Sequence, residues 1–550
     1  MHNIKRNAII LAAGKSSRFA PFTYEKPKGL FVVRGQVLIE RQIEQLIEAD
    51  VSPIYIVVGY MKEKFFYLEE KYKCVHLIIN NEFGKKGNLY SLYVAREYLK
   101  DTFICCADHY FIDNPFISND EEQIRNSSYR ACTYLSGKFR EFAITYSDAN
   151  VITNVTVGGH DSMAMVGQAY MNQCFSSKFK MLMENEIDDF GISSMFWEEF
   201  YALHQAQLTF YMKEYKSTEV REFDSIDDLR AFDSDFLLNV DSEIVENICD
   251  TLLCNPNEIY HIDILNAGLT NVSFRFEVGD KKYVYRHPGG TAGNLIDRST
   301  EIYAQQEAKN NNIDKSVIKI DQSGWKISYY IHGCKNCDFE NKKIYGMSPD
   351  NQLEVAMGYL HKLHSVTLPN DDSEYRVRRF DDVEEGKRLM HIASNTKGHL
   401  EKEFCDIIEK VERLYKIVEC DSLNVGDELV LCHNDVYSPN YLIDDSATLY
   451  LIDWEYAGIN YGANDLACIL CRDNMSDDQI ERYINVYLGH RSSCIERRYY
   501  RAFIAICAFY WFCWGLYKGS VGDDDGFFFL PSYRNLIRFL DPALRDYGLI

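Results

Sequence analysis

The feature that most constrains the fold is a regular alternation of apolar and amphipathic segments between residues 7 and about 110. The apolar runs "NAIILAAG", "PIYIVVGY", "VHLIINN" and "TFICCAD" are predicted as strands, and "LIERQIEQLIEA", "KEKFFYLEEKY" and "LYSLYVAREYL" as helices. Strands that alternate with helices predict a mostly parallel, Rossmann-like α/β sheet with helices on its faces. Ligands of such sheets bind at the carboxyl ends of the strands.

The pattern changes after about residue 240. A strand-rich segment (260–286) with one polar turn precedes a helix from about 298 and a helix-dominated remainder. Because 550 residues exceed what one hydrophobic core usually serves, two domains are expected. We predict an α/β domain over 1–240 and an α+β domain over 241–550.

Composition restricts the partners and the compartment. A formal charge of −23 without a basic block argues against nucleic acid. Seventeen cysteines without regular spacing suit a reducing compartment, and no uncharged run reaches membrane-spanning length. We expect a cytoplasmic protein without membrane insertion; the sequence leaves its oligomeric state open.

The first predicted site is the turn "KSSRFAPFTYEKPKGL", which follows the first strand. Backbone N–H groups of such a turn approach phosphates, and its Arg and Lys side chains neutralise a leaving pyrophosphate. The stretch resembles the LAAGxxSRF…PKxL signature of nucleotidyltransferases. The resemblance implies that Arg18 and Lys28 act on the phosphates, and that Leu11, Ala13 and Gly14 contact the nucleotide through the backbone.

A triphosphate reaction of this kind needs a divalent cation, which we expect to be Mg²⁺ held by carboxylates. Asp108 ends the strand "TFICCAD" on the predicted ligand side. Asp224, in "REFDSIDDL", lies in a segment that resembles the second metal-binding segment of the family, with Glu222 in reserve.

Residues 5–232 resemble the CTP:phosphocholine cytidylyltransferases of the LicC type. "KKGNLYSLYVAR" is similar to their N-x-YSL segment, which implies base or substrate contacts for Asn88 and Ser91. "FREFAITY" puts Phe142 where the family has a tryptophan that faces the choline cation, and a phenyl ring attracts such a cation less strongly than indole does. Trp197 is a candidate second face of this cage; burial in an amphipathic helix is the alternative.

The second predicted site is "LCHNDVYSPNYLIDDSATLYLIDWEYAG" (431–458). His433, Asp435 and Asn440 are spaced as H-x-D-x₄-N, and Asp453 follows in I-D-W. In protein-kinase-like folds this arrangement supplies an Asp that deprotonates the attacking hydroxyl, and an Asn and a second Asp that hold Mg²⁺ on ATP.

The segment before this motif has the pattern of a kinase amino lobe. "ILNAGLTNVSFRFEV" is predicted as two strands around a glycine-containing turn. "KKYVYRHPGG" is predicted as the strand that in kinases usually carries the ATP-binding lysine. In this sequence the residue of that strand expected to point inward is Arg286, and Glu301 can form an ion pair with it. With "SGWKI" and "LHKLH", residues 260–530 resemble bacterial choline kinases of the LicA type. Their turn GGMTN corresponds to "AGLTN", which implies nucleotide contacts by Gly268, Thr270 and Asn271.

The apolar stretch "FIAICAFYWFCWGLYKGSVG" (503–522) contains Trp511 and Trp514. Three residues apart, they share one face of a helix. Choline kinases carry a similar W-x-x-W helix, which implies an aromatic wall for a quaternary ammonium, flanked by Tyr510 and Tyr517. Core packing alone is the alternative.

Together these resemblances imply a bifunctional enzyme that phosphorylates choline with ATP and then transfers CMP from CTP to phosphocholine. The same chemistry on ethanolamine, phosphoethanolamine or 2-aminoethylphosphonate is one alternative. A sugar-phosphate nucleotidyltransferase fused to a sugar or aminoglycoside kinase is another. A nucleotide-binding regulatory module with one inactive half is the alternative outside the enzymes.

Overall fold

The computed structural model describes residues 5–117, 128–216, 219–265, 271–288, 296–369, 376–522, 526 and 529–550. The chain forms two compact units, Met1–Glu258 and Ile259–Ile550.

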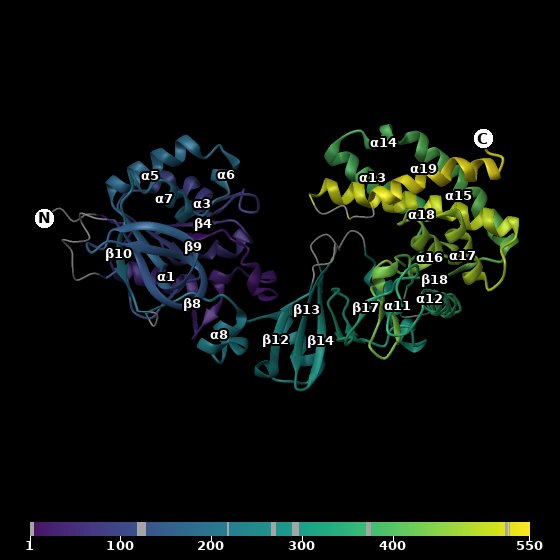
Figure 1. Cartoon of the computed structure of the whole chain (residues 1–550), viewed down its shortest axis with the longest axis horizontal. Helices are drawn as coiled ribbons and strands as arrows, with labels where there is room; N and C mark the ends of the chain where they lie inside the picture. The colour runs from purple at the N-terminus through teal and green to yellow at the C-terminus, as the bar shows by residue number, and fades with distance from the viewer. Residues whose placement is uncertain are drawn as a thin grey trace. The chain divides into compact units, whose positions relative to one another are not determined.

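The first unit is built on a seven-stranded sheet in the order β10-β8-β9-β6-β1-β4-β5. Figure 1 labels β4, β8, β9 and β10 of this sheet. The strands are β1 (Asn7–Ala12), β4 (Ile54–Val58), β5 (Val75–Ile79), β6 (Thr102–Cys106), β8 (Tyr129–Tyr146), β9 (Ile152–Met171) and β10 (Tyr211–Glu214). β6, β1, β4 and β5 are parallel, as the alternating pattern predicts, and the long hairpin β8–β9 adds the antiparallel part. The predicted Rossmann-like fold with a mostly parallel sheet is thereby confirmed.

Helices cover both faces of this sheet because β1 is apolar on both sides. Ala8 and Ile10 pack into one core with α1 (Leu38–Glu48) and α2 (Tyr67–Lys71). Ile9 and Leu11 face the other core, with α3 (Asn88–Val94), α5 (Gln173–Glu186) and α7 (Trp197–Leu203). A strand buried on both faces reads as a continuous apolar run, which is what "NAIILA" shows.

The first unit extends 18 residues beyond the boundary expected at residue 240, because α10 (Glu243–Leu252) is anchored to the first site's loop. The Glu25 carboxylate accepts hydrogen bonds from the Ser242 hydroxyl and, at 3.0 Å, from the Ile244 N–H. Lys26 Nζ donates to the Val240 carbonyl at 2.8 Å. These contacts join residues more than 200 positions apart, so local sequence pattern cannot reveal them.

The second unit begins with an antiparallel five-stranded sheet in the order β12-β13-β14-β16-β15. Its strands are β12 (Ile259–Ile264), β13 (Asn271–Val278), β14 (Lys281–Pro288), β15 (Val317–Ile320) and β16 (Lys326–Tyr329), with α11 (Arg298–Asn310) after β14. Short strands follow: β17 (Lys335–Asn336), β18 (Leu429–Cys432), β19 (Tyr441–Ile443), β20 (Leu449–Leu451) and β21 (Gly458–Tyr461). This sheet-first, helix-later order confirms the predicted kinase-like α+β fold.

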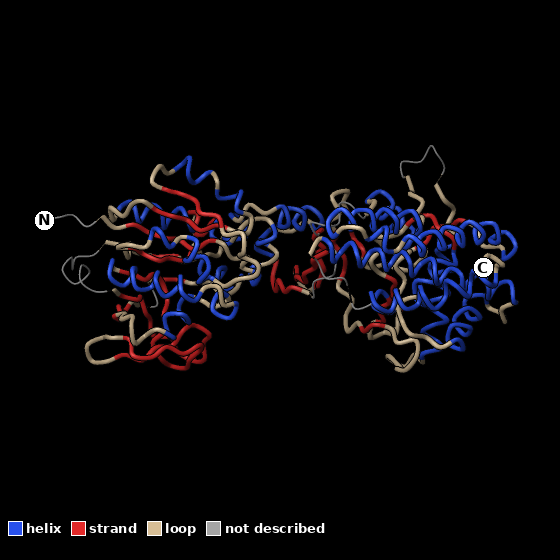
Figure 2. Tube along the Cα trace, turned by 90° about the horizontal axis from the view of Figure 1, so that it is seen from above, coloured by secondary structure: helices blue, strands red, loops and turns tan. Residues whose placement is uncertain are grey.

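Helices make up most of the rest of this unit, as the blue segments of Figure 2 show. They are α12 (Pro349–His364), α13 (Asp382–Lys397), α14 (Leu400–Glu403), α15 (Cys405–Val425), α16 (Gly462–Leu470), α17 (Asp477–Leu488), α18 (Cys494–Ser520) and α19 (Phe529–Asp546). By length and composition α18 alone among the described helices is apolar enough to cross a membrane. However, 89% of its most apolar window is buried inside the unit, which is the behaviour of a core helix.

The role of α10 makes the unit boundary testable. A fragment of residues 1–258 retains the partners of Glu25, whereas a fragment of residues 1–240 loses them and exposes the apolar face that α10 covers. We expect the shorter fragment to be less stable by about 1.5–3 kcal/mol or more, because it loses hydrogen bonds to the charged Glu25 carboxylate. Urea unfolding of both fragments, followed by circular dichroism, measures the difference; equal stabilities would place the boundary at 240.

Candidate active sites

The first unit contains a cavity of about 490 Å³ at the carboxyl ends of its parallel strands. It lies where the fold predicts a ligand site, because β1 and β6 both end at its wall. Predicted residues that line it are Leu11, Ala13, Gly14, Arg18, Lys28, Asn88, Ser91, Asp108, Phe142 and Asp224, together with the reserve candidate Glu222.

Lys28 is the central cation of this cavity. Its side chain is buried, and Nζ donates to Asp108 Oδ2 at 2.9 Å and to the Phe223 carbonyl at 2.6 Å. The ammonium also lies 4.0 Å from the centre of the Phe19 ring. Lys28 therefore joins the turn after β1, the end of β6 and the segment that carries Asp224.

Two carboxylates of the cavity are paired with cations of the chain. Partial burial raises the pKa of Asp108, but the Lys28 ammonium and His109 outweigh it and lower that pKa to about 2. Asp224 forms an ion pair with Arg18. With Glu222, these two carboxylates give one cavity three hard oxygen donors, which fit the Mg²⁺ that the triphosphate chemistry requires.

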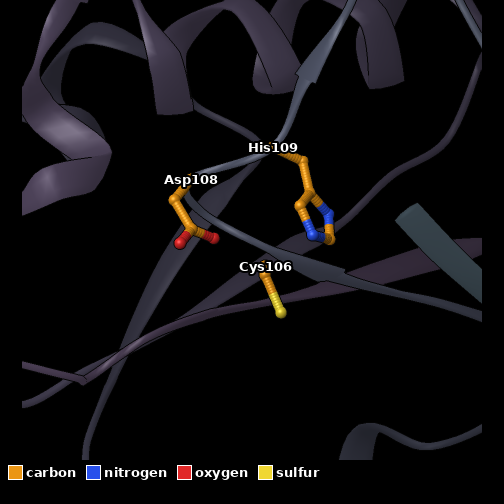
Figure 3. A group of neighbouring side chains, drawn as sticks. All are labelled: Cys106, Asp108 and His109. Atoms are coloured by element: carbon orange, nitrogen blue, oxygen red, sulfur yellow. The ribbon is translucent and has the colours of Figure 1, made fainter. Parts of the chain in front are cut away.

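Softer donors lie beside Asp108. Ligand atoms of Cys106, Asp108 and His109 are all within 4.8 Å of one another (Figure 3). His109 Nε2 is 3.5 Å from Glu222 Oε2, and the buried His109 Nδ1 has no hydrogen-bond partner among the residues that the structure describes. A thiol and an imidazole add affinity for Zn²⁺ to a site whose carboxylates suit Mg²⁺.

The expected aromatic cage is made differently from the prediction. The Trp197 side chain is 2% exposed, packs against Phe210 in the core and is not among the described residues that line the cavity. Its neighbour Phe196 is 53% exposed, lines the cavity and lies edge-on to Phe142 with ring centres 6.1 Å apart. Asn88 fixes this arrangement, because its Oδ1 accepts the Trp197 N–H at 2.8 Å.

Arg130 and Glu198 also line this cavity, and the motifs gave no signal for either. They are buried and form an ion pair at 3.3 Å. Burial raises the pKa of Glu198, and Arg130 opposes that rise.

The second unit has its own cavity, of about 370 Å³. Predicted residues that line it are Asn271, Arg286, Asp435, Asp453, Trp511 and Trp514. The predicted nucleotide contacts Gly268 and Thr270 lie outside the described residues.

Asp435 is positioned by the loop between β18 and β19. Asn440 Nδ2 donates to Asp435 Oδ2 at 3.0 Å, which brings the predicted base and a predicted metal ligand together. Asp465, on α16, accepts the backbone N–H groups of His433 and Asn434 at 3.0 and 2.7 Å. This fixes the loop that carries Asp435.

The predicted pair of Arg286 and Glu301 is present. Arg286 Nη1 lies 2.5 Å from Glu301 Oε1 and 3.8 Å from Asp453 Oδ1. Burial opposes the charge of Glu301, but Arg286 outweighs it and lowers the pKa of that carboxyl. Lys326, in "SGWKI", adds a second buried cation to the cavity, and burial lowers its pKa. Neighbouring β14 and β16 supply these cations, a pairing that the sequence motifs do not reveal.

Trp511 and Trp514 are each 2% exposed, yet both line the cavity. Trp514 Nε1 donates to the Tyr456 hydroxyl at 2.9 Å. Tyr510 and Tyr517 are buried, and the cavity's described lining includes neither.

Comparison with known proteins agrees with this geometry. Residues 8–155 match the family model of the MobA-like NTP transferase domain, and residues 262–504 match that of choline/ethanolamine kinase. A 2-aminoethylphosphonate cytidylyltransferase of Lancefieldella rimae is 34% identical over 238 residues, 42% of this chain and 94% of the relative. A choline-phosphate cytidylyltransferase of Streptococcus pneumoniae is 31% identical over 224 residues, 40% of this chain and 95% of the relative.

The chain joins an NTP transferase domain to a domain of the choline/ethanolamine kinase type, the choline kinase domain below. The second match is supported by protein LicA of Haemophilus influenzae, 23% identical over 286 residues, 50% of this chain and 99% of the relative. The resemblance of the first domain to LicC and of the second to LicA is confirmed, and both domains are transferases.

The donors beside Asp108 predict that Zn²⁺ inhibits the NTP transferase domain by competing with Mg²⁺. Cys106→Ser removes the sulfur donor, and we expect it to weaken this inhibition about tenfold or more. Pyrophosphate release from CTP at fixed Mg²⁺ and rising Zn²⁺ measures the effect.

Cys174→Ser, at an exposed cysteine, is the matched control and should keep wild-type sensitivity to Zn²⁺. Identical inhibition of the Cys106→Ser variant and the wild type would show that Zn²⁺ acts elsewhere.

Proposed function

We propose that this protein makes CDP-choline in two consecutive steps. The choline kinase domain phosphorylates choline with ATP, and the NTP transferase domain joins phosphocholine to CMP and releases pyrophosphate. The observation that carries the proposal is that each cavity combines metal-type carboxylates with buried cations. The free thiol state of all seventeen cysteines is consistent with a cytoplasmic location.

In the kinase step Asp435 accepts the proton of the choline hydroxyl as the hydroxyl oxygen attacks the γ-phosphorus of ATP, and the bond from that phosphorus to ADP breaks. Mg²⁺, when bound by Asn440 and Asp453, offsets the charge on the phosphates. Arg286 and Lys326 line the same cavity and are placed to bind the nucleotide phosphates.

In the transferase step a phosphate oxygen of phosphocholine attacks the α-phosphorus of CTP, and the bond to pyrophosphate breaks. Lys28 and Arg18 stabilise the charge that develops. Asp108 and Asp224 would hold Mg²⁺, which would compensate the remaining charge on the phosphates. No protein nucleophile is required.

The aromatic faces of Phe142 and Phe196 support choline, because a quaternary ammonium donates no hydrogen bond and is attracted by ring faces. A primary amine is the second candidate. It is favoured by the carboxylate of Glu198 in the same cavity and by the L. rimae relative, named for 2-aminoethylphosphonate.

Separate substitutions should divide the two activities. Asp435→Asn removes the kinase base, so ADP formation from ATP and choline should fall at least about a hundredfold. CDP-choline formation from supplied phosphocholine should persist. Lys28→Met should give the reverse pattern, with each product followed by chromatography.

In each variant the activity of the unsubstituted domain shows that this domain is folded. Near-UV circular dichroism checks the folding of the substituted domain. If Asp435→Asn abolished both activities in a folded protein, the two-site proposal would be wrong.

Substrate preference is tested by offering choline and ethanolamine to the kinase domain, and phosphocholine, phosphoethanolamine and 2-aminoethylphosphonate to the NTP transferase domain. We expect the highest kcat/KM with choline and phosphocholine. A higher kcat/KM with the primary amines would mean that the substrates are amino alcohols with a primary amine and not choline.

A further inference from the structure

The acceptor end of the choline kinase cavity holds a cation of the protein's own. The Arg472 guanidinium carbon lies 3.8 Å from the centre of the Trp511 ring and 4.3 Å from that of Tyr437. One guanidinium nitrogen is 2.5 Å from Asp435 Oδ1. Arg472 is 5% exposed, so this arrangement is part of the packed interior.

These contacts are the ones that a quaternary ammonium needs. Such a cation is held by aromatic faces and a nearby carboxylate, because it has no hydrogen to donate. Arg472 takes both the Trp511 face and the carboxylate of Asp435. Two positive charges in contact at one buried face repel each other strongly, so Arg472 and the acceptor's ammonium exclude one another there.

The same contact engages the proposed base. Asp435 Oδ1 is bound by Arg472 and Oδ2 by Asn440, so both carboxylate oxygens already have a donor. The acceptor hydroxyl must come within hydrogen-bonding distance of this carboxylate to be deprotonated. Release of Arg472 frees Oδ1 for that hydroxyl.

We propose that Arg472 is a resident cation at the place of the acceptor's ammonium group, and that a cationic acceptor displaces it. This inference rests on the proposed function of the domain. When the cation of the acceptor takes the Trp511 face, Arg472 leaves Asp435, and the carboxylate can then accept the hydroxyl proton. An alcohol that carries a cation therefore makes the base available. Water and neutral alcohols lack the charge to displace Arg472. Arg472 is thus a specificity-determining residue for amino alcohols.

A receiving carboxylate is available for the displaced side chain. Asp473 follows Arg472 in the chain and is exposed, and the two charges already interact. The guanidinium can therefore move toward solvent without losing ionic compensation.

Arg472→Gln tests the proposal by removing the competitor. The KM for choline should fall about tenfold, the scale of a desolvated cation–aromatic contact. The kcat at saturating choline should stay unchanged, because Arg472 is already displaced in the wild-type complex. ADP formation without acceptor should rise, since Asp435 is then open to water.

Arg498→Gln is the matched control. Arg498 also pairs with an aspartate, Asp421 at 2.7 Å, and lies 4.2 Å from the Tyr547 ring, but it does not belong to the described cavity lining. Its KM and acceptor-free rate should equal those of the wild type.

A lower kcat with unchanged KM in Arg472→Gln would overturn the proposal, because Arg472 would then be a fixed residue that orients the base. If Arg472→Gln does not fold, Arg472→Lys serves in its place. The KM for choline should then fall by a smaller factor, since an ammonium stacks less well on indole than a guanidinium. An unchanged KM in Arg472→Lys would overturn the proposal.

Tetramethylammonium separates this inference from the proposed function, because it has the cation but no hydroxyl. Titration calorimetry should show tighter binding to Arg472→Gln than to the wild type; equal affinity would overturn the displacement. Absence of choline-dependent ADP formation in the wild type would contradict the proposed function, whereas the binding comparison would still decide the role of Arg472.

Discussion

Compensation of buried negative charge governs both sites of this protein. An unpaired charge inside the fold costs several kcal/mol. The chain supplies a cation to three of its buried or partly buried carboxylates: Lys28 to Asp108, Arg286 to Glu301, and Arg472 to Asp435. The low pKa of Asp108 follows from this pairing, since Lys28 outweighs the effect of burial.

In the proposed reaction the cations that pair with these carboxylates also bind the phosphates of the ligand. Ligand binding is then an exchange in which each cation leaves a carboxylate for a phosphate. Lys28 and Arg18 neutralise carboxylates in the ligand-free protein and are the side chains placed to meet a triphosphate. A metal held by Asp108 would take that carboxylate from Lys28, and the Lys28 ammonium, still bound to the Phe223 carbonyl, could then bind phosphate. An exchange of this kind keeps the cavity close to neutral throughout, which avoids the cost of an uncompensated buried charge.

What the sequence predicts well is local. The alternation of strands and helices, the turn after β1 and the spacing of Asp435, Asn440 and Asp453 follow from neighbouring residues. What it misses depends on long-range packing. Phe196 replaces Trp197 because the start of α7 decides which of two adjacent rings faces the cavity, and Asn88, 109 positions away, holds that start. Arg472 and its contacts come from separate elements, and no motif links them.

The W-x-x-W helix shows that core packing and a place in a cavity wall are not exclusive alternatives. Trp511 and Trp514 are almost fully buried, as a core helix requires, and still form part of the cavity wall. The hydrogen bond from Trp514 to Tyr456 and the packing of α18 fix the aromatic wall before any ligand arrives. A rigid wall loses little side-chain entropy when a cation binds, which favours affinity. The ring face of Trp511 attracts a guanidinium as it attracts an ammonium. The packing that would preorganise this face for a cationic substrate therefore also holds it in place for Arg472.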